Sequence, residues 1–163
     1  MRTQPNKNYK SNDCIMTPEY LAKAIVNYFK PEGKILEPCK GTGNFLKYLL
    51  GADWCEISEG IDFMLKKGHY DWIVTNPPWS KMRKFLFHSM ELADNIVFLV
   101  TINHLWTKAR IREIKQLNFG IKEILMIPEK TKEFPQTGFR CAAIHLQKNY
   151  NGDIKLSEIK IEE

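Results

Sequence analysis

The segment Asn76-Pro77-Pro78-Trp79 carries the side chains best suited to chemistry, and it follows an apolar run at residues 72–75. The Asn76 side-chain oxygen can accept a hydrogen bond from a planar amino group, and the Pro77 carbonyl can accept a second one. Two acceptors pull the amine nitrogen toward tetrahedral geometry and free the lone pair that the ring otherwise delocalises. Proline restricts the backbone and so holds these acceptors in place. Because Trp79 could stack on a flat substrate, the segment predicts a site that alkylates such a nitrogen.

A glycine-rich turn at residues 37–43, E-P-C-K-G-T-G, forms a second candidate element. Glu37 ends a predicted strand, and Gly41 and Gly43 let the backbone approach a ligand closely. A dinucleotide fingerprint would need a third glycine where Leu46 stands, and a phosphate-binding P-loop would need G-K-[ST]. An acid at the strand end instead suits a ligand ammonium group. The alternative is an ordinary corner between a strand and a helix.

Two further acids follow the next predicted strand, residues 53–57. Glu56 lies where a carboxylate can accept hydrogen bonds from both hydroxyls of a ribose. Asp62, six residues later, could accept one from an exocyclic adenine amine, although either acid alone could be an ordinary surface carboxylate. Together with Glu37 they would line one crevice at successive strand ends. This arrangement suits S-adenosylmethionine, which has an amino-acid end, a ribose and an adenine.

Alternating strands and helices must position these residues. A helix is expected after Thr17, with Thr17 as its N-cap and Pro18 in its first turn. Further helices are expected at residues 45–50, 82–92 and 106–117, and a helical turn at 61–65. Strands are expected at 34–37, 53–57, 71–75, 95–101, 121–127 and 141–147, with an edge strand at 154–161. The alternation predicts a doubly wound α/β sheet, in which ligands bind beyond the carboxyl ends of the strands.

Composition and charge limit the possible classes. The 163 residues suffice for one domain with a real core. The net charge of +5 is compatible with a polyanionic partner, and Lys81, Arg83 and Lys84 beside the N-P-P-W segment could contact phosphates, unless they form an ordinary solvated helix face. Scattered cysteines and isolated histidines predict neither a disulfide framework nor a metal site, and favour a reducing cytoplasm. No apolar run approaches the roughly 20 residues of a membrane span, so no membrane association is expected.

Taken together, these residues resemble the amino-group methyltransferases that use S-adenosylmethionine, above all the adenine-N6 DNA methyltransferases. Residues 17–22, T-P-E-Y-L-A, are similar to the family's leading T-P-x-x-L-A element, and residues 37–45 to its glycine-rich motif. Asn76 to Trp79 match the catalytic motif, [N/D]-P-P-[Y/F/W]. The resemblance covers most of the chain. It implies a doubly wound, mostly parallel, seven-stranded sheet of the class I methyltransferase (Rossmann-like) type, with the last strand antiparallel.

The resemblance also implies roles for individual residues. The catalytic residues would be Asn76, Pro77, Pro78 and Trp79. The S-adenosylmethionine-binding residues would be Thr17, Pro18, Glu37, Pro38, Gly41, Gly43, Glu56, Asp62, Phe63 and Asn76. The substrate-binding residues would be Trp79, Lys81, Arg83, Lys84 and Phe134, the last of these packing on an extruded target base.

The chain departs from the family in three ways, one of which is that Trp79 replaces the commoner tyrosine of the catalytic motif. The stretch from Glu56 to Asp62 is shorter than usual, and no separate target-recognition domain follows the methyltransferase domain. We therefore expect a single minimal domain over residues 1–163, with target choice left to loops or to a protein partner. The expected reaction is N6 methylation of a flipped adenine, in DNA rather than RNA. Methylation of RNA bases or of a protein glutamine amide stays open, as does a cofactor-binding subunit that is not itself an enzyme.

Overall fold

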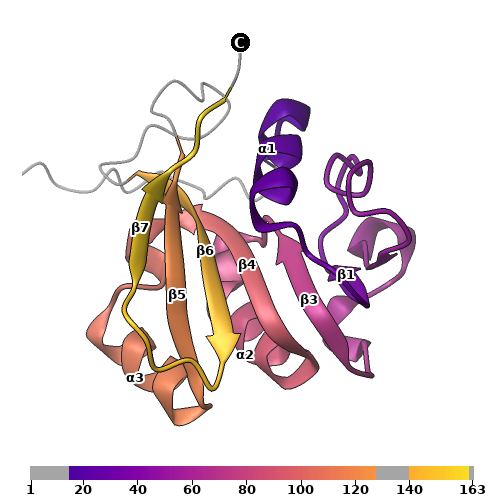
Figure 1. Cartoon of the computed structure of the whole chain (residues 1–163). Helices are drawn as coiled ribbons and strands as arrows, with labels where there is room; N and C mark the ends of the chain where they lie inside the picture. The colour runs from indigo at the N-terminus through magenta and orange to yellow at the C-terminus, as the bar shows by residue number, and fades with distance from the viewer. Residues whose placement is uncertain (1–14, 128–139, 162–163) are drawn as a thin grey trace, which may run out of the picture.

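Seven strands form one sheet in the part of the chain that the structure describes, residues 15–127 and 140–161 (Figure 1). The structure is a computed structural model. Across the sheet the strands follow the order β2-β1-β3-β4-β6-β5-β7. Their bounds are β1 Ile35–Glu37, β2 Asp53–Trp54, β3 Tyr70–Thr75, β4 Ala93–Thr101, β5 Phe119–Met126, β6 Cys141–Lys148 and β7 Lys155–Glu158.

Most neighbouring strands run parallel. β1 pairs parallel with β2 and β3, β3 pairs parallel with β4, and β5 pairs parallel with β7. β6 alone enters between β4 and β5 in the antiparallel direction. The predicted mostly parallel, seven-stranded α/β sheet is therefore confirmed.

The antiparallel direction belongs to β6, and the strand that follows it, β7, pairs parallel with β5. β7 follows β6 after residues 149–154 and pairs with the far side of β5, so it runs opposite to β6 and parallel to β5. The tail strand that the sequence predicts at residues 154–161 is thus present, over a shorter range, as one edge of the sheet.

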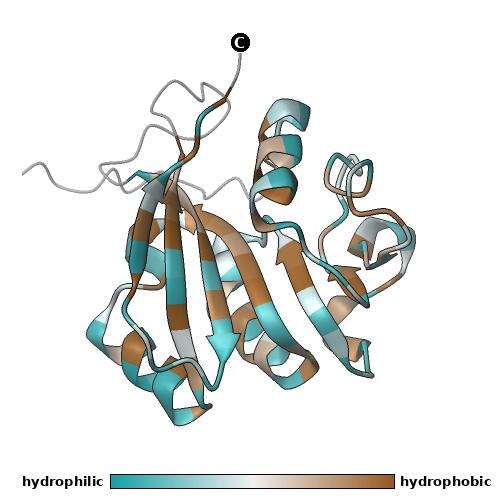
Figure 2. Cartoon of the chain, in the orientation of Figure 1, coloured by the Kyte–Doolittle hydropathy of each residue, from teal (hydrophilic) through white to brown (hydrophobic). Residues whose placement is uncertain are grey.

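Helices cover both faces of the sheet: α1 (Glu19–Phe29) lies on one face, and α2 (Met82–Leu92) and α3 (Lys108–Gln116) lie on the other (Figure 1). Successive side chains of β4 alternate between these faces, so its unbroken apolar run serves two cores. Val97 and Leu99 pack with the buried side of α1, while Ile96 and Phe98 pack with α2 and α3. Figure 2 shows this apolar character along the central strands. In residues 15–127 and 140–161, no helix combines the length and apolar character that crossing a bilayer would require.

The first helix begins differently from the prediction. α1 starts at Glu19 with Pro18 as its N-cap residue, and no side chain caps it. The expectation that Thr17 is the N-cap is therefore wrong by one position, because the backbone of Pro18 already occupies the non-helical cap conformation. The Thr17 carbonyl instead accepts a hydrogen bond of 2.9 Å from the Asn44 side chain.

The helix expected at residues 45–50 is absent, and hydrogen-bonded turns take its place. The backbone N–H groups of Tyr48 and Leu49 both donate to the Phe45 carbonyl, so the turn spacing is mixed. A run this short forms too few helical hydrogen bonds to offset the free-energy cost of helix nucleation. Gly51, whose φ lies in the left-handed region, ends the segment. The predicted strand 53–57 is likewise shortened to Asp53–Trp54, and Glu56 forms an isolated bridge with Ile61.

A buried carboxylate fastens β7 to α1. Glu123 of β5 accepts hydrogen bonds from the Tyr28 hydroxyl and from the Ser157 hydroxyl, the latter at 2.8 Å. Its Oε1 atom also lies 3.1 Å from the Lys155 ammonium group, which in turn donates to Tyr28. Partial burial works against ionisation, yet these three partners keep the pKa of Glu123 below its usual value. The carboxylate of Glu123 thus links the edge strand β7 to α1 in addition to the backbone pairing of β7 with β5.

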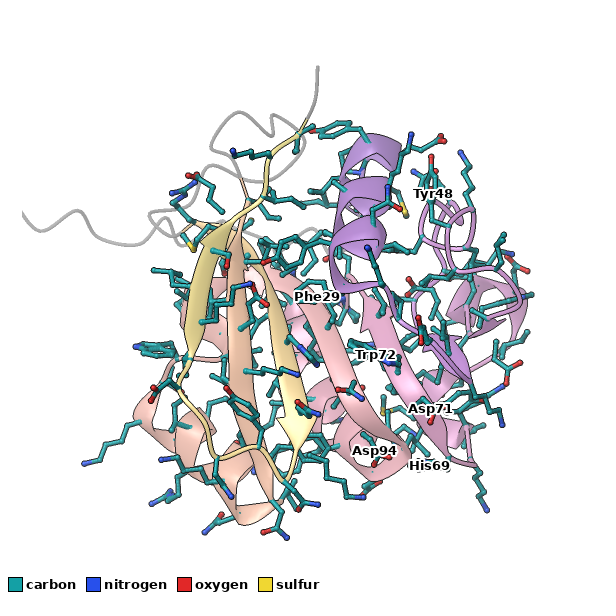
Figure 3. All side chains as sticks on the ribbon, viewed as in Figure 1. Phe29, Tyr48, His69, Asp71, Trp72 and Asp94 are labelled. Atoms are coloured by element: carbon teal, nitrogen blue, oxygen red, sulfur yellow. The ribbon has the colours of Figure 1, made fainter. Side chains whose placement is uncertain are left out.

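A second buried polar group, His145, lies on the same face of the sheet. Its side chain stacks on Trp72 with ring centroids 5.0 Å apart and meets Phe29 edge to face (Figure 3 labels both aromatic residues). Its Nε2 atom lies 3.1 Å from the Asn95 side-chain oxygen. Burial, with a smaller effect from Lys122, lowers the pKa of His145 to about 4. The imidazole is therefore neutral in the folded protein at neutral pH.

His145 should make the protein less stable in mild acid. The unfolded chain takes up a proton near pH 6.5 and the folded chain only near pH 4, so the free energy of unfolding should fall by up to about 3 kcal/mol across that interval. Urea unfolding at pH 7.5 and pH 4.5 measures this fall. His145→Gln should reduce it, whereas the exposed control His69→Gln should not. Equal falls in wild type and His145→Gln would contradict the assignment.

Candidate functional site

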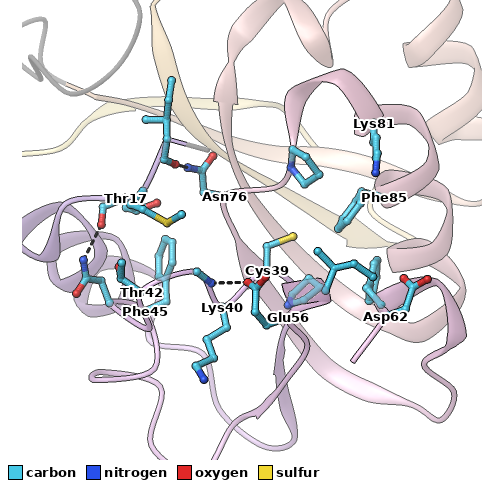
Figure 4. A pocket seen from close by; sticks show the side chains of 18 of the residues that line it. Thr17, Cys39, Lys40, Thr42, Phe45, Glu56, Asp62, Asn76, Lys81 and Phe85 are labelled. Carbon is cyan, nitrogen blue, oxygen red and sulfur yellow. Dashed lines mark hydrogen bonds between the residues drawn. The ribbon is translucent and has the colours of Figure 1, made fainter. Parts of the chain in front are cut away.

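A cavity of about 430 Å³ opens beyond the carboxyl ends of β1, β2 and β3 (Figure 4). This is the edge at which doubly wound sheets bind ligands, and the volume lies in the ordinary range for small-molecule sites. Pro38 follows β1, Glu56 follows β2 and Asn76 follows β3, and all three line the cavity. The structure therefore brings the three predicted strand-end elements to one place.

Most of the predicted site residues lie around this cavity. Those that line it are Thr17, Pro38, Gly41, Glu56, Asp62, Phe63, Asn76, Pro78, Lys81 and Lys84. Those that the structure describes elsewhere are Pro18, Glu37, Gly43, Pro77, Trp79 and Arg83, each a near neighbour in sequence of a lining residue. Phe134 lies outside the described residues.

Several lining residues were missed by the sequence analysis. Ile57 follows Glu56 directly, and Met64 comes two residues after Asp62. Phe85 lies in the first turn of α2. Their apolar side chains carry no chemical signature, so only their proximity to Glu56, Asp62 and Lys81 could have indicated them. Met16, next to Thr17, gave equally little signal.

A short strap at residues 15–17 crosses from the glycine-rich turn to the N-P-P-W segment. The Asn44 side chain holds the Thr17 carbonyl, and the Asn76 Nδ2 atom donates to the Ile15 carbonyl at 3.1 Å. This second bond orients the Asn76 amide, because it uses one of the two N–H donors on its nitrogen. The Asn76 Oδ1 atom accepts no hydrogen bond from the residues in 15–127 and 140–161, so it is the half of the amide that is left for a ligand.

The backbone conformation of Gly41 favours glycine, and the Met16 side chain of this strap lies close to it. Its φ is +51°, in the left-handed region, and a Cβ atom there would lie 2.7 Å from the Met16 sulfur. Its N–H donates to Glu56 Oε2 at 2.9 Å. One glycine thus lets the strap, the turn after β1 and the acid after β2 meet.

Glu56 is held as a carboxylate facing the cavity (Figure 4). Its Oε1 atom accepts hydrogen bonds from the Ser58 N–H and hydroxyl, and its Oε2 atom accepts from Gly41. Partial burial opposes ionisation, but these hydrogen bonds hold the pKa of Glu56 below its usual value. Oε2 keeps a second lone pair for a ligand hydroxyl, whereas a second ligand hydroxyl would have to take the place of the Ser58 hydroxyl on Oε1.

Asp62 is fixed in a similar way at the far end of the cavity (Figure 4). It caps the turn Phe63–Leu65, and its Oδ1 atom accepts from the Met64 N–H at 2.9 Å. Phe63 itself packs in the core against Phe85, with ring centroids 5.1 Å apart. The acid and the apolar wall beside it suit a flat heterocycle that carries an amino group.

Glu37 is fully buried and does not itself line the cavity, although the next two residues, Pro38 and Cys39, do. Its Oε1 atom accepts a hydrogen bond from the Cys39 N–H at 3.0 Å, while Oε2 has no partner among the residues that the structure describes. Burial, reinforced by the negative charge of Glu56, raises the pKa of Glu37 to about 8. A buried acceptor without a partner is costly, and a cationic ligand group near it would supply what it lacks.

The N-P-P-W segment and the residues that follow it into α2 contribute Pro78, Lys81, Lys84 and Phe85 to the lining. Trp79 is turned away from it, because its indole N–H donates to the Leu99 carbonyl at 3.3 Å and its ring packs between the two cores. The Arg83 guanidinium is engaged with Glu113 of α3 at 2.9 Å. Of the predicted phosphate-binding cations, Lys81 and Lys84 are thus the two that line the cavity.

Glu37→Gln should stabilise the protein at alkaline pH when no ligand is added. The folded chain holds a proton on Glu37 up to about pH 8, whereas the unfolded chain releases it near pH 4.5. Glu37 therefore leaves the free energy of unfolding unchanged below pH 4.5 and lowers it by up to about 4 kcal/mol as the pH rises toward 8. Glutamine has no proton to lose. Urea unfolding between pH 5 and pH 8.5 measures the difference, with exposed Glu32→Gln as the control. Parallel pH profiles for Glu37→Gln and wild type would refute it.

Comparison with known structures identifies the fold. A candidate class I S-adenosylmethionine-dependent methyltransferase from Listeria monocytogenes aligns with a TM-score of 0.63 and 15% identity, over 93% of this chain and 68% of that one. A candidate RNA methyltransferase from Pyrococcus horikoshii aligns with a TM-score of 0.55 and 16% identity, over 81% and 82% of the two chains. No protein-family model and no curated protein matches the sequence.

A third similar structure is longer than this chain. It is a modification subunit of a candidate type I restriction enzyme from Vibrio vulnificus YJ016, with a TM-score of 0.59 and 15% identity over 91% of this chain and 48% of that one. The present chain therefore spans about half of that subunit. At these identities the comparisons establish architecture, and the chain has the fold of the class I methyltransferases.

Proposed function

We propose that this chain transfers a methyl group from S-adenosylmethionine to the exocyclic N6 amine of adenine in DNA. The observation that carries the proposal is the fixed amide of Asn76, whose nitrogen is tied to the Ile15 carbonyl while its oxygen is left for a ligand at the cavity. An acceptor held in advance at the carboxyl end of a central strand suits the capture of an amino group.

The cavity residues fit each part of S-adenosylmethionine. Glu56 would accept hydrogen bonds from the two ribose hydroxyls, and Asp62 would accept one from the adenine amine. Glu37, buried directly before the lining residues Pro38 and Cys39, would attract the ammonium group of the methionine end, which would also favour loss of the Glu37 proton. When bound, this cofactor supplies a methyl group on a positively charged sulfur.

The N-P-P-W segment would then prepare the acceptor nitrogen. Asn76 Oδ1 and the Pro77 carbonyl would accept the two amine hydrogens, which pulls the nitrogen toward tetrahedral geometry and localises its lone pair for attack on the methyl group. The carbon–nitrogen bond forms as the sulfur–methyl bond breaks, and the nitrogen then carries a positive charge. That charge makes its hydrogen acidic, so solvent can remove the proton without a strong base from the protein.

The acceptor end of the cavity supports a nucleic acid substrate. The Lys81 and Lys84 side chains are exposed there and can contact phosphates on either side of an extruded base. Extrusion costs a few kcal/mol, which such contacts must offset. Similarity to a modification subunit of a candidate restriction enzyme favours DNA, and the greater length of that subunit is consistent with target choice by a partner or further domain.

RNA is the second candidate acceptor. The same fold occurs in a candidate RNA methyltransferase, and the two lysines would serve either polymer. A subunit without activity is the less favoured reading, because the Asn76 amide and the strand-end acids keep an arrangement that such a subunit would not need.

The proposed reaction predicts labelled adenine in DNA. With methyl-labelled cofactor, wild type should produce N6-methyladenine, and Asn76→Ala should lower kcat by about 100-fold or more because one amine acceptor is removed. Nucleoside mass spectrometry after incubation with duplex DNA, single-stranded DNA or structured RNA identifies the product. His69→Gln, remote and exposed, serves as the control. Label in RNA alone would favour the second candidate, and no label in either polymer despite cofactor binding would refute the proposed activity.

Cofactor binding can be tested separately at the ribose end. Glu56→Gln removes a charged acceptor and should weaken S-adenosylmethionine binding by about 10- to 100-fold, since hydrogen bonds to charged groups contribute about 1.5–3 kcal/mol. Titration calorimetry measures the dissociation constant. Glu91→Gln removes an exposed carboxylate of α2 and should bind as wild type does. Equal affinities for Glu56→Gln and Glu91→Gln would show that Glu56 does not hold the cofactor.

A further inference from the structure

The ring of Trp79 is attached to the neighbouring strand rather than left free at the cavity. Its indole N–H donates to the Leu99 carbonyl of β4 at 3.3 Å. The ring packs, partly buried, against both hydrophobic clusters, and it lies 5.7 Å from the His104 ring in the turn that follows β4. A side chain expected to stack on the substrate thus contacts the backbone and core of its own protein.

The strand register explains why the Leu99 carbonyl needs this donor. β3 and β4 pair in parallel up to Thr75 opposite Phe98. Continuing the same register would place Pro77 opposite Val100, where its N–H would point toward the carbonyl of the preceding residue, Leu99. Proline has no N–H, so the backbone of β3 cannot supply that hydrogen bond. The indole of Trp79, two residues further on, supplies one instead.

We propose that Trp79 is a positioning residue, whose indole N–H takes the ladder place that Pro77 leaves vacant and holds the N-P-P-W segment on β4. This rests on the proposed function, because the segment's purpose is to present the Asn76 oxygen and the Pro77 carbonyl to an amine. The Ile15 carbonyl restrains Asn76 from one side. Trp79 restrains the following residues from the other, so the two acceptors are fixed between two hydrogen bonds.

This role requires an aromatic ring with an N–H donor that can reach the Leu99 carbonyl, and the indole of tryptophan provides it. Phenylalanine would keep most of the apolar packing but has no N–H, and the Leu99 carbonyl would lose its partner. A role in stacking makes the opposite demand, because any flat ring would do. The two roles therefore differ in what Trp79→Phe does to catalysis.

The kinetic test is Trp79→Phe, with Trp106→Phe as the matched control at an exposed indole. If Trp79 positions the acceptors, kcat should fall at least tenfold, while KM for nucleic acid and the cofactor dissociation constant should change less than threefold. A kcat near wild type, or a loss confined to KM for nucleic acid, would overturn the proposal. Thermal unfolding of both variants shows whether a loss of kcat merely reflects a loss of fold.

Indole hydrogen exchange tests the same bond without methyl transfer. In ¹⁵N-labelled protein, the indole signal that disappears in Trp79→Phe should exchange with solvent at least tenfold more slowly than the Trp106 indole signal. Equal exchange rates would overturn the proposal even in an active enzyme. The protein could instead show slow exchange and bind cofactor but methylate no nucleic acid. The hydrogen bond from Trp79 to Leu99 would then be present, and the proposed function would be the part that fails.

Discussion

The missing N–H groups of Pro77 and Pro78 are the constraint on which the site depends. They stop the parallel ladder of β3 and β4 at Thr75 and Phe98, so the chain leaves the sheet at Asn76 with its carbonyls free of strand partners. The segment needs other restraints at that point, and the strap at residues 15–17 and the indole of Trp79 provide them. The proposed acceptor geometry is thus a consequence of an interrupted sheet.

Two buried titratable groups make the stability of this small domain depend on pH in opposite directions. His145 stays neutral within an aromatic and amide environment and contributes stability that is lost in acid. Glu37 holds a proton that costs stability as the pH rises, and it does so beside the cavity. The first group belongs to the packing of α1 on the sheet. The second is a strained feature at a candidate ligand site, where the native structure tolerates a cost that a ligand could remove.

The sequence predicted the central elements well because their signals were strong. Examples are the apolar strand β4, the N-P-P-W segment that ends β3 and the helix α2, all of which the structure contains close to their predicted ranges. It failed where short segments depend on contacts from elsewhere, as at residues 45–50 and at Thr17. The position of Trp79 was also out of reach, since residue type predicts a stacking surface but only the strand register reveals an unoccupied carbonyl.

The fastening of β7 has a consequence for how the domain assembles. Tyr28 and Lys155 are 127 positions apart, yet both converge on Glu123, the carboxylate that secures the edge of the sheet. Contacts between such distant positions form late and slow the search for the native state. This contact can close only after α1 has met both β5 and β7, so α1 is secured to the sheet edge late in folding.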